Sequence, residues 1–236
     1  MHPVRTPWNN LPDAIIDRKL AEATGHLLYK KAKSGDVKSA YGLAKELVTD
    51  NAITQLRKLI GSNKPILVPV HALEPVGTNM IPMATAEIIS ESLGLWIETS
   101  IVQAIKVSRT GADGWHRLAN SPYFSGDFSS GNTAIMIDDT LTQGGTFASL
   151  KGHIESQGGQ VLAAYGLTGK QYSRQLTISD QTLCSLRKEY EEIEQWWSQT
   201  FGYDFSKLTE WEARYIINSR KAPHDIRDRI IKAKQV

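Results

Sequence analysis

The sequence predicts an α/β fold in which a mostly parallel sheet is flanked by helices. Three short apolar segments, at 65–70, 134–137 and 161–167, are bounded by turn-forming residues, which is typical of strands buried on both faces. Amphipathic helical patterns lie between them, and the order strand, helix, strand favours parallel pairing. We expect a helical N-terminal extension, an α/β core and a helical C-terminal hood, at residues 1–62, 63–170 and 171–236.

The composition indicates a soluble, cytoplasmic protein that binds small molecules. A formal net charge of +2 over 236 residues is too balanced for a dedicated nucleic-acid binder, which usually has a basic face. Cys184 is the single cysteine, so no internal disulfide can form and a reducing compartment is favoured. No apolar run approaches the ~20 residues that span a bilayer, and no signal peptide is recognisable. We therefore expect neither a membrane nor a nucleic acid as partner.

The first part of the chain is predicted to be helical. Pro12 begins an apolar pattern at helical spacing, Gly35 interrupts it, and two further helices are expected before residue 62. The cluster of Lys30, Lys31 and Lys33 is interpreted as a solvated helix face. No recognisable chemistry lies in this region.

The core is expected to begin with the strand at 65–70, followed by a loop and a helix that ends at Gly94. Residues 95–97 and then 101–107, with β-branched residues clustered in the second stretch, predict further strands that continue the sheet. A long polar segment follows, at 106–127, and connections of that length in a compact domain are usually functional. We expect it to be mobile.

The most informative stretch is Ala134-Ile-Met-Ile-Asp-Asp-Thr-Leu-Thr-Gln-Gly-Gly-Thr146. Asp138 and Asp139 are expected at the carboxyl end of the strand, where open α/β sheets bind ligands. The turn that follows leads into an amphipathic helix, so backbone N–H groups and a helix N-terminus can converge on one anion. It has neither the lysine of a Walker A motif nor the spacing of a dinucleotide fingerprint. The pattern predicts a phosphate site beside two carboxylates, which suits a sugar phosphate.

This stretch, from Ile135 to Thr146, resembles the loop of type I phosphoribosyltransferases that binds phosphoribosyl pyrophosphate (PRPP). In that family an apolar strand runs into two acidic residues and a turn rich in hydroxyls and glycine that ends in threonine. The resemblance covers the core and is silent about both ends of the chain. It implies a Rossmann-like core and transfer of a 5-phosphoribosyl group from PRPP to a nitrogenous acceptor, a nucleobase, with release of pyrophosphate.

The resemblance also implies roles for the motif residues. Asp138 and Asp139 would be catalytic, because they would hold the ribose hydroxyls and place negative charge near a ribosyl centre that becomes positive. Mg²⁺ is the implied cofactor, carried mainly by ligand oxygens and water, so no direct protein ligand is assigned. The implied phosphate-binding residues are Thr140, Leu141, Thr142, Gln143, Gly144, Gly145 and Thr146.

The leaving pyrophosphate and the acceptor would lie beside this loop. In the resembling family the loop after the first strand holds the pyrophosphate, and here its one candidate cation is His71. The long segment at 106–127 would close over the pyrophosphate as a lid. Lys170 and Tyr172 follow the third strand and are candidates for contacting the acceptor. The cations that the lid could bring are Lys106, Arg109, His116 and Arg117.

The C-terminal region is predicted to be helical from residue 179. Ser179 or Asp180 can cap a helix whose apolar residues recur as far as Trp197, and Thr209 and Glu212 have the spacing of a capping box. The apolar stripe is interpreted as packing, since neighbouring acidic residues would repel a nucleic-acid backbone. An unpaired stripe would promote aggregation, so we expect it to be buried against the pocket rim or in a homodimer.

Two other functions stay open at this point. A regulator could keep the fold and sense PRPP or a nucleotide without turnover. A hydrolase could use the same pocket to cleave the N-glycosidic bond of a nucleotide, with water as acceptor. The sequence does not identify the acceptor base.

Overall fold

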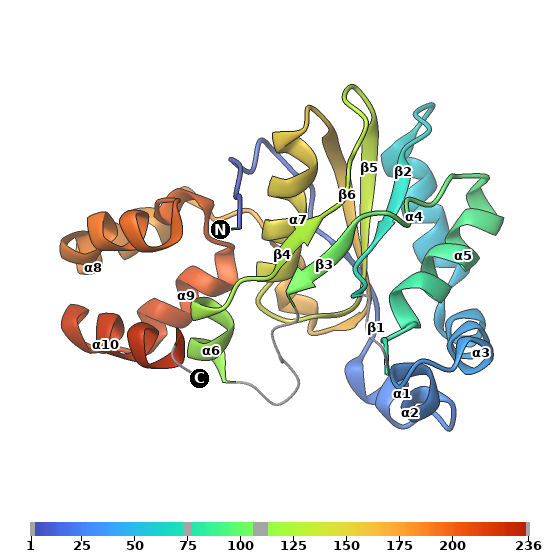
Figure 1. Cartoon of the computed structure of the whole chain (residues 1–236), viewed down its shortest axis with the longest axis horizontal. Helices are drawn as coiled ribbons and strands as arrows, with labels where there is room; N and C mark the ends of the chain where they lie inside the picture. Colours follow the sequence, from blue (N-terminus) through green and yellow to red (C-terminus); the bar gives the residue numbers. More distant parts are fainter. Residues whose placement is uncertain (1–2, 73–76, 106–112, 235–236) are drawn as a thin grey trace.

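The computed structural model describes residues 3–72, 77–105 and 113–234 (Figure 1). The elements in chain order are β1 (Ile15–Arg18), α1 (Leu20–Thr24), α2 (Tyr29–Lys33), α3 (Val37–Leu47), α4 (Asp50–Ile60), β2 (Ile66–Pro69), α5 (Ile81–Leu93), β3 (Val102–Ile105), α6 (Gly114–Ala119), β4 (Tyr123–Ser125), β5 (Thr133–Leu141), α7 (Gly145–Ser156), β6 (Gln160–Gly169), the 3₁₀ turn η1 (Gln171–Arg174), α8 (Asp180–Phe201), the 3₁₀ turn η2 (Phe205–Lys207), α9 (Glu210–Asn218) and α10 (Pro223–Lys234).

Four parallel strands form the central sheet in the order β1-β6-β5-β2. Strand β5 lies inside the sheet, where Ile137 is in register with Pro69 of β2 and with Tyr165 of β6. The chain passes from β5 through α7 to the parallel neighbour β6, which is the expected βαβ unit. The predicted fold class, α/β with a mostly parallel sheet and flanking helices, is confirmed.

Helices cover both faces of this sheet (Figure 1). Helices α4 and α5 pack on one face, and α7 packs on the other. Successive residues of β5 therefore alternate between two buried clusters: Ile135 and Ile137 lie in the cluster with α3, α4 and α5, whereas Ala134 and Met136 lie in the cluster on the α7 side. This alternation decides where the acidic residues at the end of β5 point.

Strand β1 corrects the prediction of a purely helical N-terminal region. Ile15 and Ile16 are in parallel register with Tyr165 and Gly166 of β6, so residues assigned to a helix form an edge strand of the core sheet. A short apolar segment has no periodicity that separates a strand from a buried helix. Here the segment forms a strand because it pairs with the edge of β6. The three-part division of the chain stays a prediction, with the correction that its first part contributes a strand.

Strands β3 and β4 form a separate antiparallel pair, so the prediction that the sheet continues is wrong for residues 102–105. The prediction holds for Ile97, which forms a parallel bridge with Leu67 of β2. The pair is attached to the core by the Gln103 N–H, which donates to the carbonyl oxygen of His71 at 2.8 Å. Strand β4 also packs against α7. The small sheet thus lies next to the carboxyl end of β2 and against α7 rather than extending the main sheet.

The segment expected to be a polar loop contains a helix. In α6, Trp115 and Leu118 are buried, and the Asp113 carboxylate caps the helix by accepting from the His116 N–H at 2.8 Å. Helix α6 packs against α10 of the C-terminal region. The interpretation of 106–127 as one irregular polar loop is therefore wrong for α6 and β4, while residues 106–112 lie outside the described residues.

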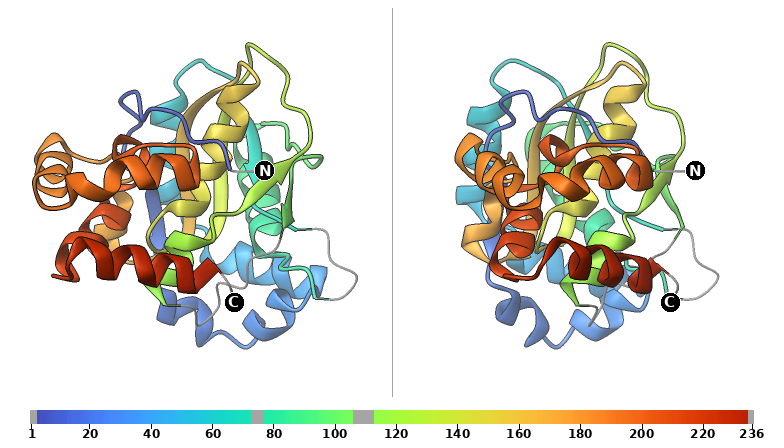
Figure 2. Two further views of the ribbon diagram at one scale, coloured as in Figure 1. Left: turned by 60° about the vertical axis from the view of Figure 1, so that its left-hand side comes forward. Right: turned by 90° about the vertical axis from the view of Figure 1, so that its left-hand side faces the viewer.

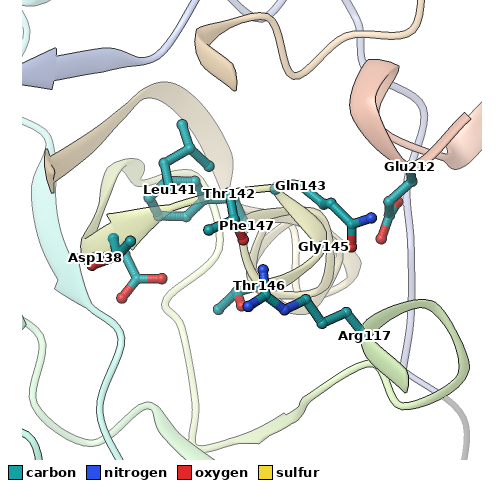
Figure 3. A pocket seen from close by; sticks show the side chains of 11 residues that line it. Arg117, Asp138, Leu141, Thr142, Gln143, Gly145, Thr146, Phe147 and Glu212 are labelled. Atoms are coloured by element: carbon teal, nitrogen blue, oxygen red, sulfur yellow. The ribbon is translucent and has the colours of Figure 1, made fainter. Parts of the chain in front are cut away.

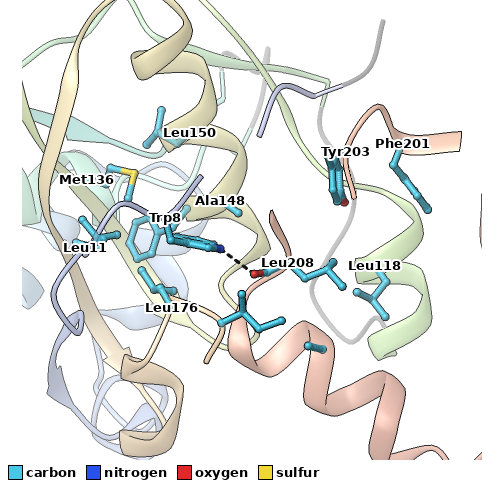
Figure 4. Close-up of a cluster of buried hydrophobic side chains, with 14 of the residues drawn as sticks. Trp8, Leu11, Leu118, Met136, Ala148, Leu150, Leu176, Phe201, Tyr203 and Leu208 are labelled. Carbon is cyan, nitrogen blue, oxygen red and sulfur yellow. Dashed lines mark hydrogen bonds between the residues drawn. The ribbon is translucent and has the colours of Figure 1, made fainter. Parts of the chain in front are cut away.

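The C-terminal helices share a hydrophobic core with the α7 face of the sheet (Figure 4). Trp8 of the N-terminal segment and Leu208, which precedes α9, meet in this cluster, where the Trp8 indole N–H donates to the Leu208 carbonyl at 2.8 Å. The predicted stripe of α8 is buried, including Leu186 and Trp197, which confirms its interpretation as packing. Figure 2 shows α8 and α10 together on one side of the sheet. In the part of the chain that the structure describes, every helix is too short or too polar to cross a bilayer.

Candidate functional site

The predicted phosphate loop leaves β5 and leads into α7, as the sequence indicated. Gly144 is the N-cap of α7 and has φ +85°, a left-handed conformation that glycine adopts without steric cost. Because glycine has no side chain, it cannot accept a hydrogen bond from the first N–H groups of the helix. These N–H groups and the positive end of the helix dipole therefore favour an anion at this point.

A pocket lies over this helix N-terminus (Figure 3). Its lining comes from β5, the loop, the first turn of α7, helix α6 and helix α9. The lining residues are Arg117, Asp138, Thr140, Leu141, Thr142, Gln143, Gly144, Gly145, Thr146, Phe147 and Glu212. All seven residues that the resemblance assigned to phosphate binding line this one pocket, together with the first of the two acidic residues.

The acidic pair lies inside a strand and not at its end. Strand β5 continues to Leu141, whereas β2 ends at Pro69 opposite Ile137. Asp138 and Asp139 therefore occupy the part of β5 that extends beyond β2, and consecutive side chains of a strand point to opposite faces. Asp138 lines the pocket on the α7 side, and Asp139 points towards the N-terminal helices with only 8% of its surface exposed.

The environment of Asp138 disfavours its charge. Burial raises the pKa of Asp138 well above the usual value for aspartate, and the neighbouring Asp139 carboxylate raises it further. Its carboxylate accepts from the backbone N–H of Asp139 at 2.8 Å, which opposes this shift. A cationic ligand centre or a hydroxyl donor beside Asp138 would stabilise the ionised form.

Asp139 is held by two residues that sequence analysis did not connect with the site. The Lys33 ammonium at the end of α2 forms an ion pair with Asp139 Oδ2, and Asn79 Nδ2 donates to the same oxygen at 2.9 Å. Burial lowers the pKa of Lys33, but the attraction of Asp139 outweighs it and the net shift is upward. The interpretation of Lys33 as part of a solvated face is therefore wrong, although Lys30 and Lys31 are largely solvent-facing. No local pattern could join residues 106 positions apart.

Helix α9 supports the back of the loop through a buried ion pair. The Arg5 guanidinium donates to both carboxylate oxygens of Glu212, at 2.6 and 2.8 Å, and the two side chains are 1% and 2% exposed. Glu212 Oε2 also accepts from the Thr209 N–H, and the Thr209 hydroxyl donates to the Gln143 carbonyl of the loop. The predicted capping box is confirmed and was the one sequence signal for this contact.

The glycine pair has a packing role that sequence analysis missed. A Cβ atom on Gly145 would lie 2.5 Å from Glu212 Oε1, and one on Gly144 would lie 2.6 Å from Leu176 Cδ2. Both distances are too short for a side chain. Close approach of the C-terminal region therefore requires glycine here, in addition to any approach of a ligand.

The candidate cations are dispersed. Arg117 lines the pocket, and its side chain extends towards Thr146 (Figure 3). His116 lies on the same short helix with its ring 3.3 Å from Asn120 Nδ2, and the His71 ring lies 3.2 Å from the Pro69 carbonyl. Neither histidine lines the pocket. Lys106 and Arg109 lie outside the described residues.

The two acceptor candidates lie beyond the pocket lining. Tyr172 is half exposed and packs against Trp211 with ring centroids 4.2 Å apart. The Lys170 ammonium lies 5.4 Å from the centre of the Tyr172 ring. Their assignment to an acceptor stays a prediction.

The side chains present suit a metal ion that arrives with its ligand. Among the described residues, no group of three or more His, Cys, Asp or Glu side chains is arranged to hold a metal. Asp138 could supply one oxygen from the pocket, which fits Mg²⁺ coordinated mainly by phosphate oxygens and water. The Mg²⁺ cofactor stays a prediction.

The fold and site define an α/β protein with a polar pocket at the carboxyl edge of a parallel sheet, built on the N-terminus of α7. No family model matches the sequence. The chain is 41% identical over 233 residues to a protein named TraN from Escherichia coli, covering 98% of this chain and 51% of TraN. It is 56% identical over 152 residues to an uncharacterized protein from Haemophilus influenzae, covering 64% of this chain and 34% of that protein. The matches thus span about half of one relative and a third of the other.

Solved structures with some likeness to this chain include phosphoribosyltransferases. An adenine phosphoribosyltransferase is 18% identical, with a TM-score of 0.38, over 56% of this chain and 72% of that one. The adenine phosphoribosyltransferase from Thermoanaerobacter pseudethanolicus is 17% identical, with a TM-score of 0.34, over 57% and 74% of the two chains. UMP synthase from Leishmania donovani is 13% identical, with a TM-score of 0.34, over 77% and 33%.

Proposed function

We propose that this protein is a phosphoribosyltransferase, which moves a 5-phosphoribosyl group from PRPP to a nitrogenous acceptor and releases pyrophosphate. The observation that carries the proposal is the pocket itself: residues 140–146 surround the N-terminus of α7, and Asp138 lines the same pocket. A sugar phosphate matches this arrangement, since its phosphate needs donors and its hydroxyls need acceptors.

The loop would hold the 5′-phosphate of the ligand. The first N–H groups of α7 point along the helix axis towards the pocket, and Thr142 and Thr146 add hydroxyl donors. Arg117 brings a guanidinium to the same pocket, and a guanidinium can donate two hydrogen bonds to one phosphate. The ion pair between Arg5 and Glu212 keeps the Glu212 carboxylate, which also lines the pocket, from repelling that phosphate.

Asp138 would act on the ribose. Its carboxylate can accept from a ribose hydroxyl and place negative charge near C1. In the reaction the C1–O bond to pyrophosphate breaks, a C1–N bond to the acceptor forms, and the acceptor nitrogen gives up its proton to solvent or a base. Bound Mg²⁺ would neutralise charge on the leaving pyrophosphate. Asp138 is the pocket residue that could supply a carboxylate oxygen to this ion.

The test is incubation of the protein with PRPP, Mg²⁺ and a panel of nucleobases, with pyrophosphate release as readout. Release that depends on one base supports transfer. The matched variant is Thr142→Val, which keeps the shape of the side chain and removes one proposed donor, and it should raise KM for PRPP. If calorimetry shows that the parent protein binds neither ribose 5-phosphate nor PRPP, the proposal is wrong.

A second candidate function is a sensor that binds PRPP or a nucleotide without turnover. The observation that favours it is the ion pair between Lys33 and Asp139, which occupies one of the two carboxylates assigned to catalysis. Binding of PRPP without base-dependent release of pyrophosphate would indicate a sensor. Release of a free base from a nucleotide would indicate the hydrolase instead.

A further inference from the structure

The pyrophosphate end of the proposed ligand lacks an obvious cation from the central part of the chain. Between Pro65 and Ile105 the sequence contains neither lysine nor arginine, so strand β2, the loop that follows it and helix α5 bring no permanent positive charge. Pyrophosphate is a multiply charged anion, and its binding is strengthened by charge-assisted hydrogen bonds. A cation from elsewhere in the chain would have to supply them.

Helix α2 brings such a cation to the open edge of β5. The end of α2 lies against the approach to α5, where the Met80 N–H donates to the Ala32 carbonyl at 3.3 Å. This contact places the Lys33 ammonium on Asp139, in the part of β5 that extends beyond β2. The Lys33 side chain is 33% exposed and that of Asp139 is 10% exposed. The lysine is therefore the partner that has room to move.

Asn79 fixes the carboxylate independently of Lys33. Its Oδ1 accepts from the Ile81 N–H at 3.2 Å at the start of α5, and this orients its amide group so that Nδ2 donates to Asp139 Oδ2. Both Lys33 and Asn79 donate to Oδ2, and no donor from the described residues reaches Oδ1. If Lys33 moves away, Asp139 keeps its hydrogen bond from Asn79, and its Oδ1 can accept a hydrogen bond from a ligand.

We propose that Lys33 is the residue that binds the pyrophosphate group of PRPP, exchanging its ion pair with Asp139 for one with a phosphate oxygen; this inference rests on the proposed function of the pocket. When the ligand is absent, Asp139 holds Lys33 at the sheet edge. When PRPP binds, the ribose hydroxyls supply donors to Asp139, and the flexible stem of Lys33 lets its ammonium turn to the phosphate. A lysine ammonium is charged at neutral pH in both arrangements, because each places it beside an anion.

A purely structural ion pair between α2 and β5 makes a different prediction. If Lys33 only fixes α2 to the sheet, its removal weakens every ligand of the pocket to the same degree. If Lys33 binds pyrophosphate, its removal weakens PRPP and spares ribose 5-phosphate, which lacks that group. The ratio of the two affinities separates the roles.

The experiment measures the affinity of ribose 5-phosphate and of PRPP with Mg²⁺ by calorimetry, for the parent protein and for Lys33→Met. The control variant is Lys31→Met, which removes the same charge from the same helix at a largely solvent-facing position. We expect Lys33→Met to lose roughly tenfold or more in affinity for PRPP and to stay within about twofold for ribose 5-phosphate. Lys31→Met should change neither, and Lys33→Arg should recover most of the PRPP affinity.

Equal losses for both ligands in Lys33→Met, or no loss for either, overturn the role of Lys33 while leaving the proposed function intact. A parent protein that binds neither ligand overturns the proposed function instead. If Lys33→Met does not fold, the same two affinities are measured for Lys33→Gln, whose amide can still donate to Asp139 but carries no charge. A selective loss of PRPP affinity supports the inference, and equal changes for the two ligands, or no change, contradict it.

Discussion

Asp138 and Asp139 are neighbours in sequence, and their side chains point to opposite faces of the sheet. The first lines the pocket in an environment that disfavours its charge, and the second is buried in an ion pair with Lys33. Asp139 therefore helps to hold α2 against β5, in addition to any contact with a ligand. A substitution at Asp139 should affect folding as well as binding, whereas Asp138 offers a cleaner test.

We predict that Asp138→Asn makes the unliganded protein more stable at neutral pH and weakens its binding of ribose 5-phosphate. The folded-state pKa of Asp138 is raised, so its contribution to stability is present below the usual pKa of 3.8 and is lost as the pH rises through the folded-state pKa. The folded protein disfavours a charged carboxylate at this position, so the asparagine variant, which carries no charge, should have the larger free energy of unfolding at pH 7. Urea unfolding of parent and variant measures this difference.

The change in the free energy of unfolding caused by Asp138→Asn should depend on pH. The stability gain of Asp138→Asn should shrink as the pH approaches 3.8, where the parent carboxyl is also neutral. A variant that is less stable than the parent at pH 7 would show that the carboxylate forms stabilising contacts in the unliganded protein. Calorimetry on the same samples should show that loss of the charged acceptor costs about 1.5–3 kcal/mol in ligand binding.

At the scale of elements, the loop is held between helices from distant parts of the chain. Helix α7 begins at the loop, α9 supports it through Thr209 and Glu212, and α6 brings Arg117 to its open side. The N-terminal segment completes the support, because Arg5 pairs with Glu212. The site therefore depends on contacts between elements that no local sequence pattern joins.

The buried pair of Arg5 and Glu212 should be costly to break. Arg5→Met leaves the Glu212 carboxylate without its cation in a buried position, and loss of one partner of such a pair costs about 3–5 kcal/mol. The double variant Arg5→Met with Glu212→Gln should recover a large part of this loss, since no uncompensated charge remains. The free energy of unfolding from urea titration measures both values.

The matched control is the surface pair of Arg187 and Glu194, in which the arginine side chain is 44% exposed. Arg187→Met should cost about 1 kcal/mol or less, because water screens an exposed ion pair. A loss for Arg5→Met that is no larger than that for Arg187→Met would contradict the support role that we assign to the buried pair.

Arg117 of helix α6 should contribute to the binding of the ligand's phosphate. Arg117→Met should weaken ribose 5-phosphate by about 1.5–3 kcal/mol, the range for a hydrogen bond to a charged group. Ribose without a phosphate provides the control ligand, since its affinity should not depend on a guanidinium that meets the phosphate. A variant that binds ribose 5-phosphate like the parent would remove Arg117 from the site.

At the scale of the whole molecule, the C-terminal helices are part of the packing of the core. Residues of β5 and α7 share a buried cluster with α8, α9 and α10, so removal of these helices would expose one face of the structure to water. Exposed apolar surface of this extent promotes aggregation. The fold gives these helices a structural role whatever further partners they bind.

Truncation after Gly169 should therefore give insoluble protein or protein that no longer binds ligand. The truncated chain loses Glu212 and Thr209 behind the loop in addition to the buried face of α8. Size-exclusion chromatography and calorimetry with ribose 5-phosphate measure the two outcomes. A soluble, monomeric truncation with the ligand affinity of the full chain would show that the C-terminal helices do not support the site.

Elements with local signals could be predicted from the amino-acid sequence. The strand at β5, the glycine turn, the start of α7 and the capping box at Thr209 follow from hydrophobic patterning and backbone preferences within a few residues, and the structure contains each of them. The parallel sheet followed from the alternation of these elements. Three features depend on long-range packing: the strand at Ile15–Arg18, the contact of Lys33 with Asp139, and the support of the loop by Arg5 and Glu212. These contacts join residues that are far apart in the chain. They form because a strand edge needs a partner and a buried charge needs a counter-charge, and both needs arise only in the folded protein.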